Sequence, residues 1–506
     1  MVNPSTNKLG AVHRVLGLPE LIRLICEFLE KDAARLVCLS RSLFASAAPV
    51  VWADIELRHL LGLVPGTKQV RLGETEDNDW YVHYVSMLEF VTPVSRQRIE
   101  YQRLEMSAQI DLKRFDFYAP FVKRLSTSYP YAIKLPLQWE QSIQETAATP
   151  LLPNLSHLTV AHTTPIRREN IEWATLFIGP SLLSFESHYR FSKSLHETEE
   201  EVFTTELVAK MLQVCVRLER LCVHSREDLL VPVSSLIHLR FFSVNECGAT
   251  DELLHALGRL PSLEKLEIFS EWRSPHDMRK EPVELSDDSF PSLRHLYLYQ
   301  ISPFCIARFC ASSKLFRKLV NVSIFFDHSC IVRDMDNLER FTAVVFPLGH
   351  NSPYVTKLRV QLWGWFAPSW STIDSFKQMP LRHLDLYSVA LGLEDYVIRL
   401  TVEDCPVYHP LIGWSDFLAA VPLLEKFRLT DQTLGLSTLP AFASMLPRLQ
   451  LLDLDKIEFS GAEEIPSIDG WHPATQFITI RTSVFRIPIG GKVTISDIAR
   501  FVNEFL

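Results

Sequence analysis

The sequence has little glycine, with 17 glycines against 30 prolines in 506 residues. That is about half of the ~7% glycine that is usual in soluble proteins, which disfavours a fold built on phosphate-binding loops or many tight hairpins. The motifs G-x-x-x-x-G-K-[ST], G-x-S-x-G, HExxH and G-x-G-x-x-G do not occur either. The sequence therefore offers no known arrangement of catalytic residues, and we expect neither an enzyme nor a cofactor.

Basic runs, cysteine pairs and long apolar runs are missing as well. The net charge is −9, with no run of four Lys or Arg residues, so nucleic acid and membrane surfaces are disfavoured as partners. The nine cysteines form no CxxC motif, and the pair Cys405 and His409 fits a surface turn better than a metal site. Without 18 consecutive apolar residues or a signal-peptide pattern, we expect a soluble intracellular protein of the cytoplasm, the nucleus or both.

Residues 18–52 predict three short helices. The first begins at Pro19, whose missing N–H costs little in a first turn. The second is expected over Ala33–Leu39 with Asp32 as its cap, and the third from Arg41 to Ala48, ending before Pro49. Apolar residues recur at helical spacing in the first helix: Leu21, Leu24, Ile25 and Phe28. So small a unit buries little surface alone and needs a partner or a neighbouring domain.

The ordered set LPELIRLICEFL, then an apolar pair, LSR, Pro and Trp, resembles an F-box. The family's F-box is a three-helix module that docks on an SKP-type adaptor within a cullin–RING ubiquitin ligase. Cys38 stands where the family usually has another apolar or small residue, and Phe44 near a position that is often Trp. The alternative reading is a helical cap over the first unit of a repeat array. The resemblance implies these adaptor-facing residues: Leu18, Pro19, Leu21, Ile25, Leu29, Leu36, Leu39, Ser40, Arg41 and Trp52.

Residues 56–120 are expected to form a helical connecting region, with helices within 80–90 and 95–106. The segment RFDFYAPFVKRLSTSY (114–129) resembles the one that joins the F-box to the repeats in basidiomycete-type F-box proteins. In those fungal proteins a YAPxVxxL pattern introduces the first repeat strand. We therefore expect the repeats to begin near residue 121.

From there the formula L-x-x-L-x-[LVI] recurs, as in SLEKLEI (262–268) and SLRHLYL (292–298). Most intervals between successive copies lie between 21 and 30 residues, close to the period of leucine-rich repeats. Proline often precedes the formula, as at Pro261 and Pro291. The first apolar residue of each copy stands at position 155, 182, 218, 239, 263, 293, 319, 355, 381, 424 or 449.

The last two apolar residues of the formula are two apart and point to one face of a strand. One such unit cannot bury its own apolar faces, but stacked neighbours can. We therefore expect an α/β fold over 121–506, an irregular leucine-rich-repeat solenoid with a curved parallel sheet and outer helices; an ordinary α/β protein is the alternative. The asparagine at the ninth position of that repeat is missing, so the turns must be bonded in another way. A helix over 496–505, with Ser496 as its cap, is expected to close the array.

The expected organisation is a flexible start (1–14), an F-box (15–55), the connecting region (56–120) and the solenoid (121–506). The resemblance implies a non-catalytic substrate receptor of an SKP–cullin–F-box ubiquitin ligase that binds a protein substrate through its repeats. The alternative is a leucine-rich-repeat interaction scaffold outside any ligase. The segment WGWFAPSW is either a loop packed on the core or an aromatic recognition site. Its candidate substrate-binding residues are Trp363, Trp365, Phe366 and Trp370.

Overall fold

The structure is a computed structural model. It describes residues 18–29, 33–71, 102–105, 111–127, 131–134, 150–162, 173–189, 208–223, 233–245, 249–269, 284–301, 309, 313–326, 348–362, 376–388, 418–435, 444–458 and 479–486. The chain divides into two compact units, Met1–Leu239 and Arg240–Leu506. Among the described residues, no helix has the length and apolar character needed to cross a bilayer.

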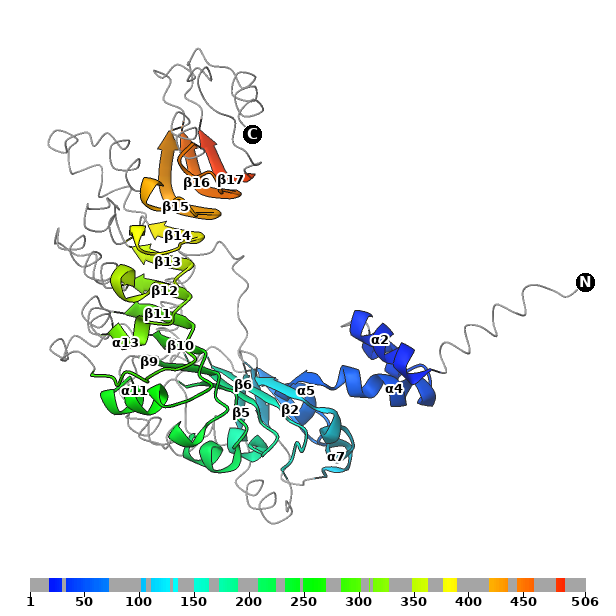
Figure 1. The fold of residues 1–506 in the computed structure, drawn as a ribbon. Helices are drawn as coiled ribbons and strands as arrows, with labels where there is room; N and C mark the ends of the chain where they lie inside the picture. The colour runs from blue at the N-terminus through cyan, green and yellow to red at the C-terminus, as the bar shows by residue number, and fades with distance from the viewer. Residues whose placement is uncertain are drawn as a thin grey trace, which may run out of the picture. The chain divides into compact units, whose positions relative to one another are not determined.

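The first unit begins with three helices, α2 (Pro19–Leu29), α3 (Ala33–Val37) and α4 (Arg41–Val51) (Figure 1). They lie where the sequence predicts helices, but α4 does not end before Pro49. Small residues occupy the preceding turn, where the proline ring needs room. The Trp52 N–H still donates to Ala48 O at 2.9 Å, so one more turn forms beyond the expected end. The expected cap Asp32 lies outside the described residues.

The connecting region is not simply helical. It contains the short elements β1 (Asp54–Glu56), α5 (Leu57–Leu61), α7 (Lys113–Tyr118) and η3 (Ala119–Phe121). A second, three-stranded sheet is made of β2 (Lys68–Arg71), β3 (Gln102–Glu105) and β5 (Tyr131–Lys134).

Strand β3 lies where the sequence favours a helix over 95–106. It pairs antiparallel with β2 and in parallel with β5, and this tertiary pairing overrides a weak helical pattern. The helix expected within 80–90 lies outside the described residues.

The first unit continues with parallel strands in the order β1, β4, β6, β7 and β8. Their bounds are β4 (Arg124–Thr127), β6 (His157–His162), β7 (Ser184–Tyr189) and β8 (Arg220–Cys222). Short helical segments lie between or after them, among them η4 (Trp173–Phe177), residues 208–214 and η5 (Val233–Ser235).

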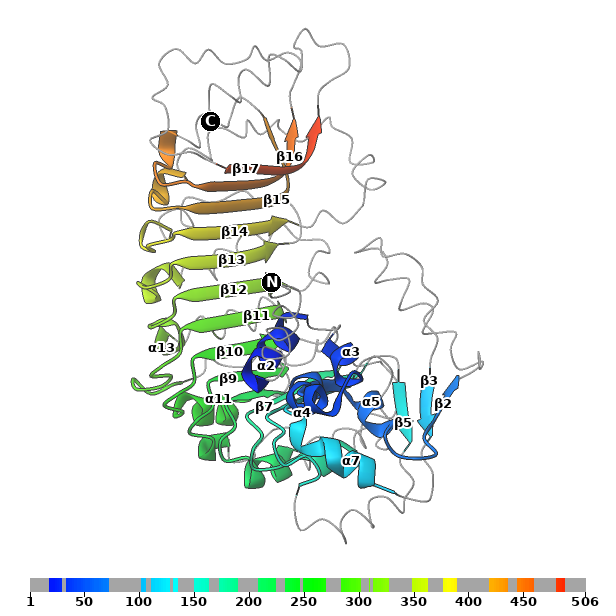
Figure 2. The same cartoon turned by 90° about the vertical axis from the view of Figure 1, so that its right-hand side faces the viewer.

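The second unit contains nine parallel strands among its described residues, each paired with the next along the chain (Figure 2). The strands are β9 (Phe241–Asn245), β10 (Lys265–Phe269), β11 (His295–Ile301), β12 (Asn321–Phe326), β13 (Lys357–Leu362), β14 (His383–Ser388), β15 (Lys426–Gly435), β16 (Leu451–Glu458) and β17 (Thr479–Arg486). Helices α11 (Asp251–Gly258) and α13 (Ser313–Phe316) precede β10 and β12. Thr250 caps α11 by accepting a hydrogen bond from Leu253 N at 3.3 Å.

The repeat formula predicts the strands correctly. In each of the eleven copies the strand begins two residues after the first apolar position, and that apolar residue is at most 1% exposed. At β10, for example, Leu263 just before the strand and Leu266 and Ile268 within it are all fully buried, while the residues between them are partly exposed. One parallel strand per copy of the formula, with its leucines in a shared core, is the arrangement of a leucine-rich-repeat solenoid.

The turns are bonded without an asparagine ladder. At the entry to β11, the backbone N–H groups of Arg294 and His295 both donate to Glu264 O, at 2.9 and 3.0 Å. The same double donation occurs at β10, β12, β13, β14, β15 and β16. Hydroxyl groups add to it, as where Ser181 Oγ donates to Leu155 O at 2.9 Å. The carbonyl groups of each turn are thus bonded by the following repeat. The closing helix expected over 496–505 lies outside the described residues.

Candidate functional site

Helices α2, α3 and α4 pack around a small core of their own. Its buried members are Ile22, Cys26, Ala33, Leu43 and Ala47. Four partly exposed residues pack against them: Ile25, Leu36, Val50 and Val51. Ile22 and Cys26 are four residues apart and share one side of α2. Helix α2 packs on α3 and α4 because this packing removes the apolar side chains of Ile22 and Cys26 from water.

Helix α2 also carries apolar side chains that this core does not use: Leu21, Leu24 and Phe28 share the side away from Ile22 and Cys26, and Leu18 and Leu29 lie at the two ends of the helix. We call Leu18, Leu21, Leu24, Phe28 and Leu29 the α2 apolar face. Phe28 is 89% exposed and Leu24 is 59% exposed. Beyond α3, Leu39 is 68% exposed. Single exposed apolar residues are common, but a run of them on one side of a helix is typical of a surface that binds a partner.

The residues that the F-box resemblance implies fall into three groups. Ile25 and Leu36 contribute to the helical core and are only partly exposed. Trp52 is turned toward the connecting region. The remaining seven are exposed: Leu18, Pro19, Leu21, Leu29, Leu39, Ser40 and Arg41. The resemblance does not include Leu24 and Phe28, although their helical spacing with Leu21 marks them as part of the same side.

Ser40 has a structural role in addition to its exposure. Its backbone is extended at the start of α4, and its Oγ accepts a hydrogen bond from Leu43 N at 3.2 Å. This satisfies one of the N–H groups that the first turn of a helix leaves free. The serine of the LSR triplet therefore fixes where α4 begins.

Trp52 stacks on Tyr118 of α7, with ring centroids 4.2 Å apart and an interplanar angle of 29°. Phe44 of α4 contacts the same tyrosine and the neighbouring Phe117, at centroid distances of 6.2 and 5.9 Å. These rings pack together where the three helices meet the connecting region. Trp52 therefore connects the helices to the rest of the first unit, and we leave it out of the proposed adaptor surface.

A second candidate surface lies on the sheet of the second unit. Residues that alternate with the buried leucines lie on the opposite face, which we call the outer face. The parallel pairing aligns them into rows that cross the strands. The first, which we call the basic row, contains Lys265, His295, Asn321, Lys357, His383 and Lys426 in consecutive register. The second, the mixed row, contains Glu267, Tyr297, Ser323, Arg359, Asp385, Arg428, Asp453 and Arg481.

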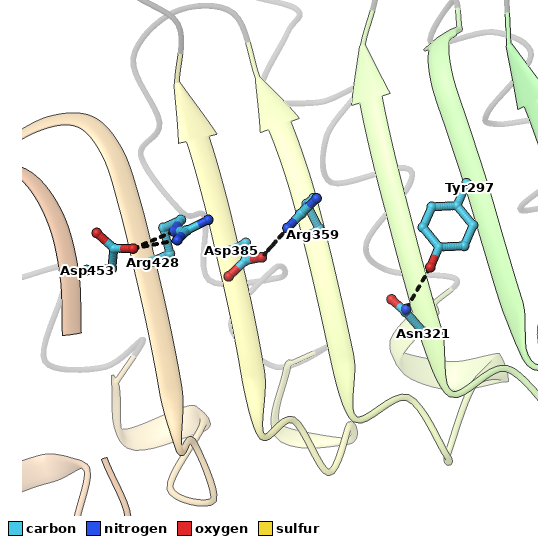
Figure 3. A network of polar contacts seen from close by, with 6 residues as sticks. All are labelled: Tyr297, Asn321, Arg359, Asp385, Arg428 and Asp453. Atoms are coloured by element: carbon cyan, nitrogen blue, oxygen red, sulfur yellow. Dashed lines mark hydrogen bonds and ion pairs between the residues drawn. The ribbon is translucent and has the colours of Figure 1, made fainter. Parts of the chain in front are cut away.

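Ion pairs bridge neighbouring strands along the mixed row (Figure 3). Arg359 on β13 donates from Nε and an Nη to Asp385 Oδ2 on β14, both at 3.1 Å. Arg428 on β15 donates from Nε to Asp453 Oδ2 on β16 at 2.7 Å. Each aspartate is thus held by the arginine on the preceding strand. The carboxylates of the mixed row are engaged inside the sheet.

Lys265 shows how closely this face is packed. Its Nζ lies 2.7 Å from Glu267 Oε1 and 4.3 Å from the centroid of the Tyr297 ring. Tyr297 Oη in turn accepts a hydrogen bond from Asn321 Nδ2 at 3.0 Å (Figure 3). Lys357 and Lys426 differ, because among the described residues neither has a carboxylate within ion-pair distance.

The pKa values of the two histidines of the basic row are lowered first by burial and then by neighbouring cations. Burial lowers the pKa of His295, and the neighbouring charges of Lys265, Arg294 and Lys357 lower it further, against an opposing effect of Glu264. The pKa of His383 is lowered by burial and then by Lys426 and Lys357. Burial also raises the pKa of Tyr299, which lies two residues after Tyr297 on β11, to about 12.

The aromatic recognition site expected at Trp363, Trp365, Phe366 and Trp370 lies outside the described residues, as does the pair Cys405 and His409. Within the described ranges, no three His, Cys, Asp or Glu side chains are grouped so that they could hold a metal ion.

No family model matches the chain, and no curated protein sequence is significantly similar to it. Among solved structures, an internalin from Listeria monocytogenes aligns at 12% identity with a TM-score of 0.35, covering 76% of this chain and 87% of the internalin chain. A TLR13–ssRNA13 complex aligns at 14% identity with a TM-score of 0.32, covering 74% of this chain and 48% of that chain. The repeat architecture of this chain therefore rests on its own strand register and buried leucines.

Proposed function

We propose that this chain is a non-catalytic substrate receptor of an SKP–cullin–F-box type ubiquitin ligase. Its first three helices dock on the SKP-type adaptor, and its repeats bind the protein to be ubiquitinated. The single observation that carries the proposal is the α2 apolar face, which is exposed although the helices have a small core of their own.

Exposing the α2 apolar face to water is unfavourable in free energy compared with burying it against a partner. Burying a leucine or phenylalanine side chain contributes about 1.5–3 kcal/mol, so several exposed side chains on one side of a helix favour association with an apolar partner surface. The F-box resemblance supplies the identity of that partner. Leu18, Leu21, Leu29 and Leu39 are both implied by the resemblance and exposed, and they form the centre of the proposed adaptor contact.

The repeats supply the second half of the function. A protein held on the outer face of the sheet stays attached to the same chain as the adaptor-binding helices. The receptor then accelerates ubiquitin transfer by proximity and needs no reactive side chain of its own.

Affinity purification of the full chain, with the bound proteins identified, tests the proposal. We expect an SKP-type adaptor and a cullin with the wild type, and neither with the variant Leu21→Asp/Phe28→Asp. The matched control is Ile237→Asp, because Ile237 is also an apolar residue and is 53% exposed in the turn before β9. Recovery of the adaptor without a cullin would instead indicate a scaffold outside the ligase. Equal recovery with wild type and double variant would refute adaptor docking through α2.

A further inference from the structure

We infer that the outer face of the second unit's sheet binds an acidic, extended segment of a partner protein, with Lys357 and Lys426 as the main contacts for its carboxylates. Used as the substrate site of the receptor, this surface rests on the proposed function. The binding itself does not require the adaptor.

The first support is a local charge opposite to that of the chain. The chain carries a net charge of −9. The basic and mixed rows together contain the cationic residues Lys265, Lys357, Lys426, Arg359, Arg428 and Arg481, against the carboxylates Glu267, Asp385 and Asp453. This face is therefore positive on an acidic protein, and it attracts negatively charged partners at close range.

The second support is the pairing inside the face. Lys265 engages Glu267, Arg359 engages Asp385 and Arg428 engages Asp453. Lys357 and Lys426 remain without a carboxylate among the described residues, on either side of His383 in the basic row. A ligand carboxylate that approaches these two lysines replaces water and breaks no ion pair of the sheet.

The third support is spacing. Lys357 and Lys426 stand at equivalent positions two strands apart, which places their Cα atoms about 10 Å from each other because neighbouring strands are ~4.8 Å apart. An extended peptide advances about 3.3 Å per residue. Carboxylates three residues apart on a segment that crosses the strands therefore match the two lysines.

The same features favour a peptide over a nucleic acid. A nucleic acid strand has a phosphate at every nucleotide and needs a continuous cationic groove or exposed aromatic rings for stacking. Here Asp385 and Asp453 interrupt the positive charge. Tyr299 stacks on Tyr297 and on Phe325, with centroids 6.0 and 4.7 Å apart, so these rings already have partners within the sheet.

Fluorescence anisotropy of the purified full chain tests the inference, with a fluorescein-labelled oligoglutamate peptide as the probe and oligoglutamine of equal length as its uncharged control. We expect saturable binding of oligoglutamate alone, and a Kd that rises with salt. The variant Lys357→Gln/Lys426→Gln should raise the Kd about three- to tenfold, because exposed ion pairs are individually weak. The control Lys123→Gln, which removes an exposed lysine of the first unit, should leave the Kd unchanged.

A second double variant separates charge from folding. Asp385→Asn/Asp453→Asn removes the two carboxylates that occupy Arg359 and Arg428, and we expect it to lower the Kd about two- to fivefold. Damage to the fold would raise it. Failure of the wild type to bind, equal binding of oligoglutamine, or tighter binding of a single-stranded oligouridylate would overturn the inference. A Leu21→Asp/Phe28→Asp chain should still bind the peptide, so this result is independent of adaptor docking.

Discussion

Arg359 of β13 donates two hydrogen bonds, each of 3.1 Å, to a single carboxylate oxygen of Asp385 on β14. The two side chains are 32% and 15% exposed, and they lie at paired positions of the parallel sheet. The contact therefore joins two successive repeats on the face opposite the core.

The first prediction concerns this contact. In a double-mutant cycle of Arg359→Ala and Asp385→Ala, we expect a coupling energy of about 0.5–1 kcal/mol in the free energy of unfolding, since the pair is only partly exposed to solvent. Urea denaturation of the four proteins measures it. The cycle formed by Arg23 and Glu27, an exposed pair on α2 with side chains 62% and 51% exposed, should give a smaller value. Additive single effects at Arg359 and Asp385 would contradict the prediction.

The second prediction concerns the first leucine of the repeat formula. Leu263 is fully buried where the chain turns into β10. Leu263→Ala should lower the free energy of unfolding by about 2–5 kcal/mol, because it leaves a cavity between stacked repeats. Ile237→Ala, at an apolar residue that is 53% exposed, should change it by less than about 0.5 kcal/mol. Equal effects in urea denaturation would show that the formula does not mark the core.

The third prediction concerns pH. In the folded chain, burial lowers the pKa values of His295 and His383. Nearby cations lower them further: Lys265, Arg294, Lys357 and Lys426. The charges of Glu264, Glu425 and Asp385 act in the opposite direction. The unfolded chain therefore takes up these two protons first as the pH falls. Their contribution to stability is fully present above the ordinary histidine pKa of about 6.5 and decreases as the pH drops through and below it.

The measurement compares the free energy of unfolding at about pH 7 and about pH 5 for the wild type and for His295→Gln/His383→Gln. The double variant should lose less stability on acidification than the wild type. His255→Gln, at a histidine in α11 away from the basic row, is the matched control and should follow the wild type. An unchanged pH dependence in the double variant would contradict the lowered pKa values of these two histidines.

The fourth prediction separates two roles of Ser40. Ser40→Ala should destabilise the start of α4 by about 0.5–2 kcal/mol, whereas Ser40→Asp retains a capping oxygen and should cost much less. Adaptor binding should follow the same order, weakened in the alanine variant and retained in the aspartate variant. If both variants lose the adaptor with unchanged stability, Ser40 contacts the adaptor directly and does not act through the cap.

The strands of the repeat region could be predicted from the sequence because each one carries the same local formula. In β10 the leucines of SLEKLEI are buried and the residues between them form the outer face. The three helices at the start could also be predicted, since their apolar residues are regularly spaced. These features depend on residues near each other in the chain.

The connecting region and the outer face depend on distant partners, and this is why sequence reasoning missed them. Strand β3 forms because β2 and β5 offer hydrogen bonds on either side, and nothing within 95–106 signals those neighbours. Likewise, Lys357, His383 and Lys426 are far apart in the sequence and become neighbours only through strand register. The three residues share one position of the formula, two residues after its first apolar residue, at 355, 381 and 424.

Calorimetric titration of a purified SKP-type adaptor into the purified full chain measures docking on the adaptor most directly. We expect a stoichiometric complex with the wild type and with Ile237→Asp. With Leu21→Asp/Phe28→Asp we expect at least a hundredfold weaker binding, since charges replace two apolar contacts, each worth about 1.5–3 kcal/mol. Absence of binding by the wild type, or wild-type affinity in the double variant, would contradict docking of the adaptor on α2.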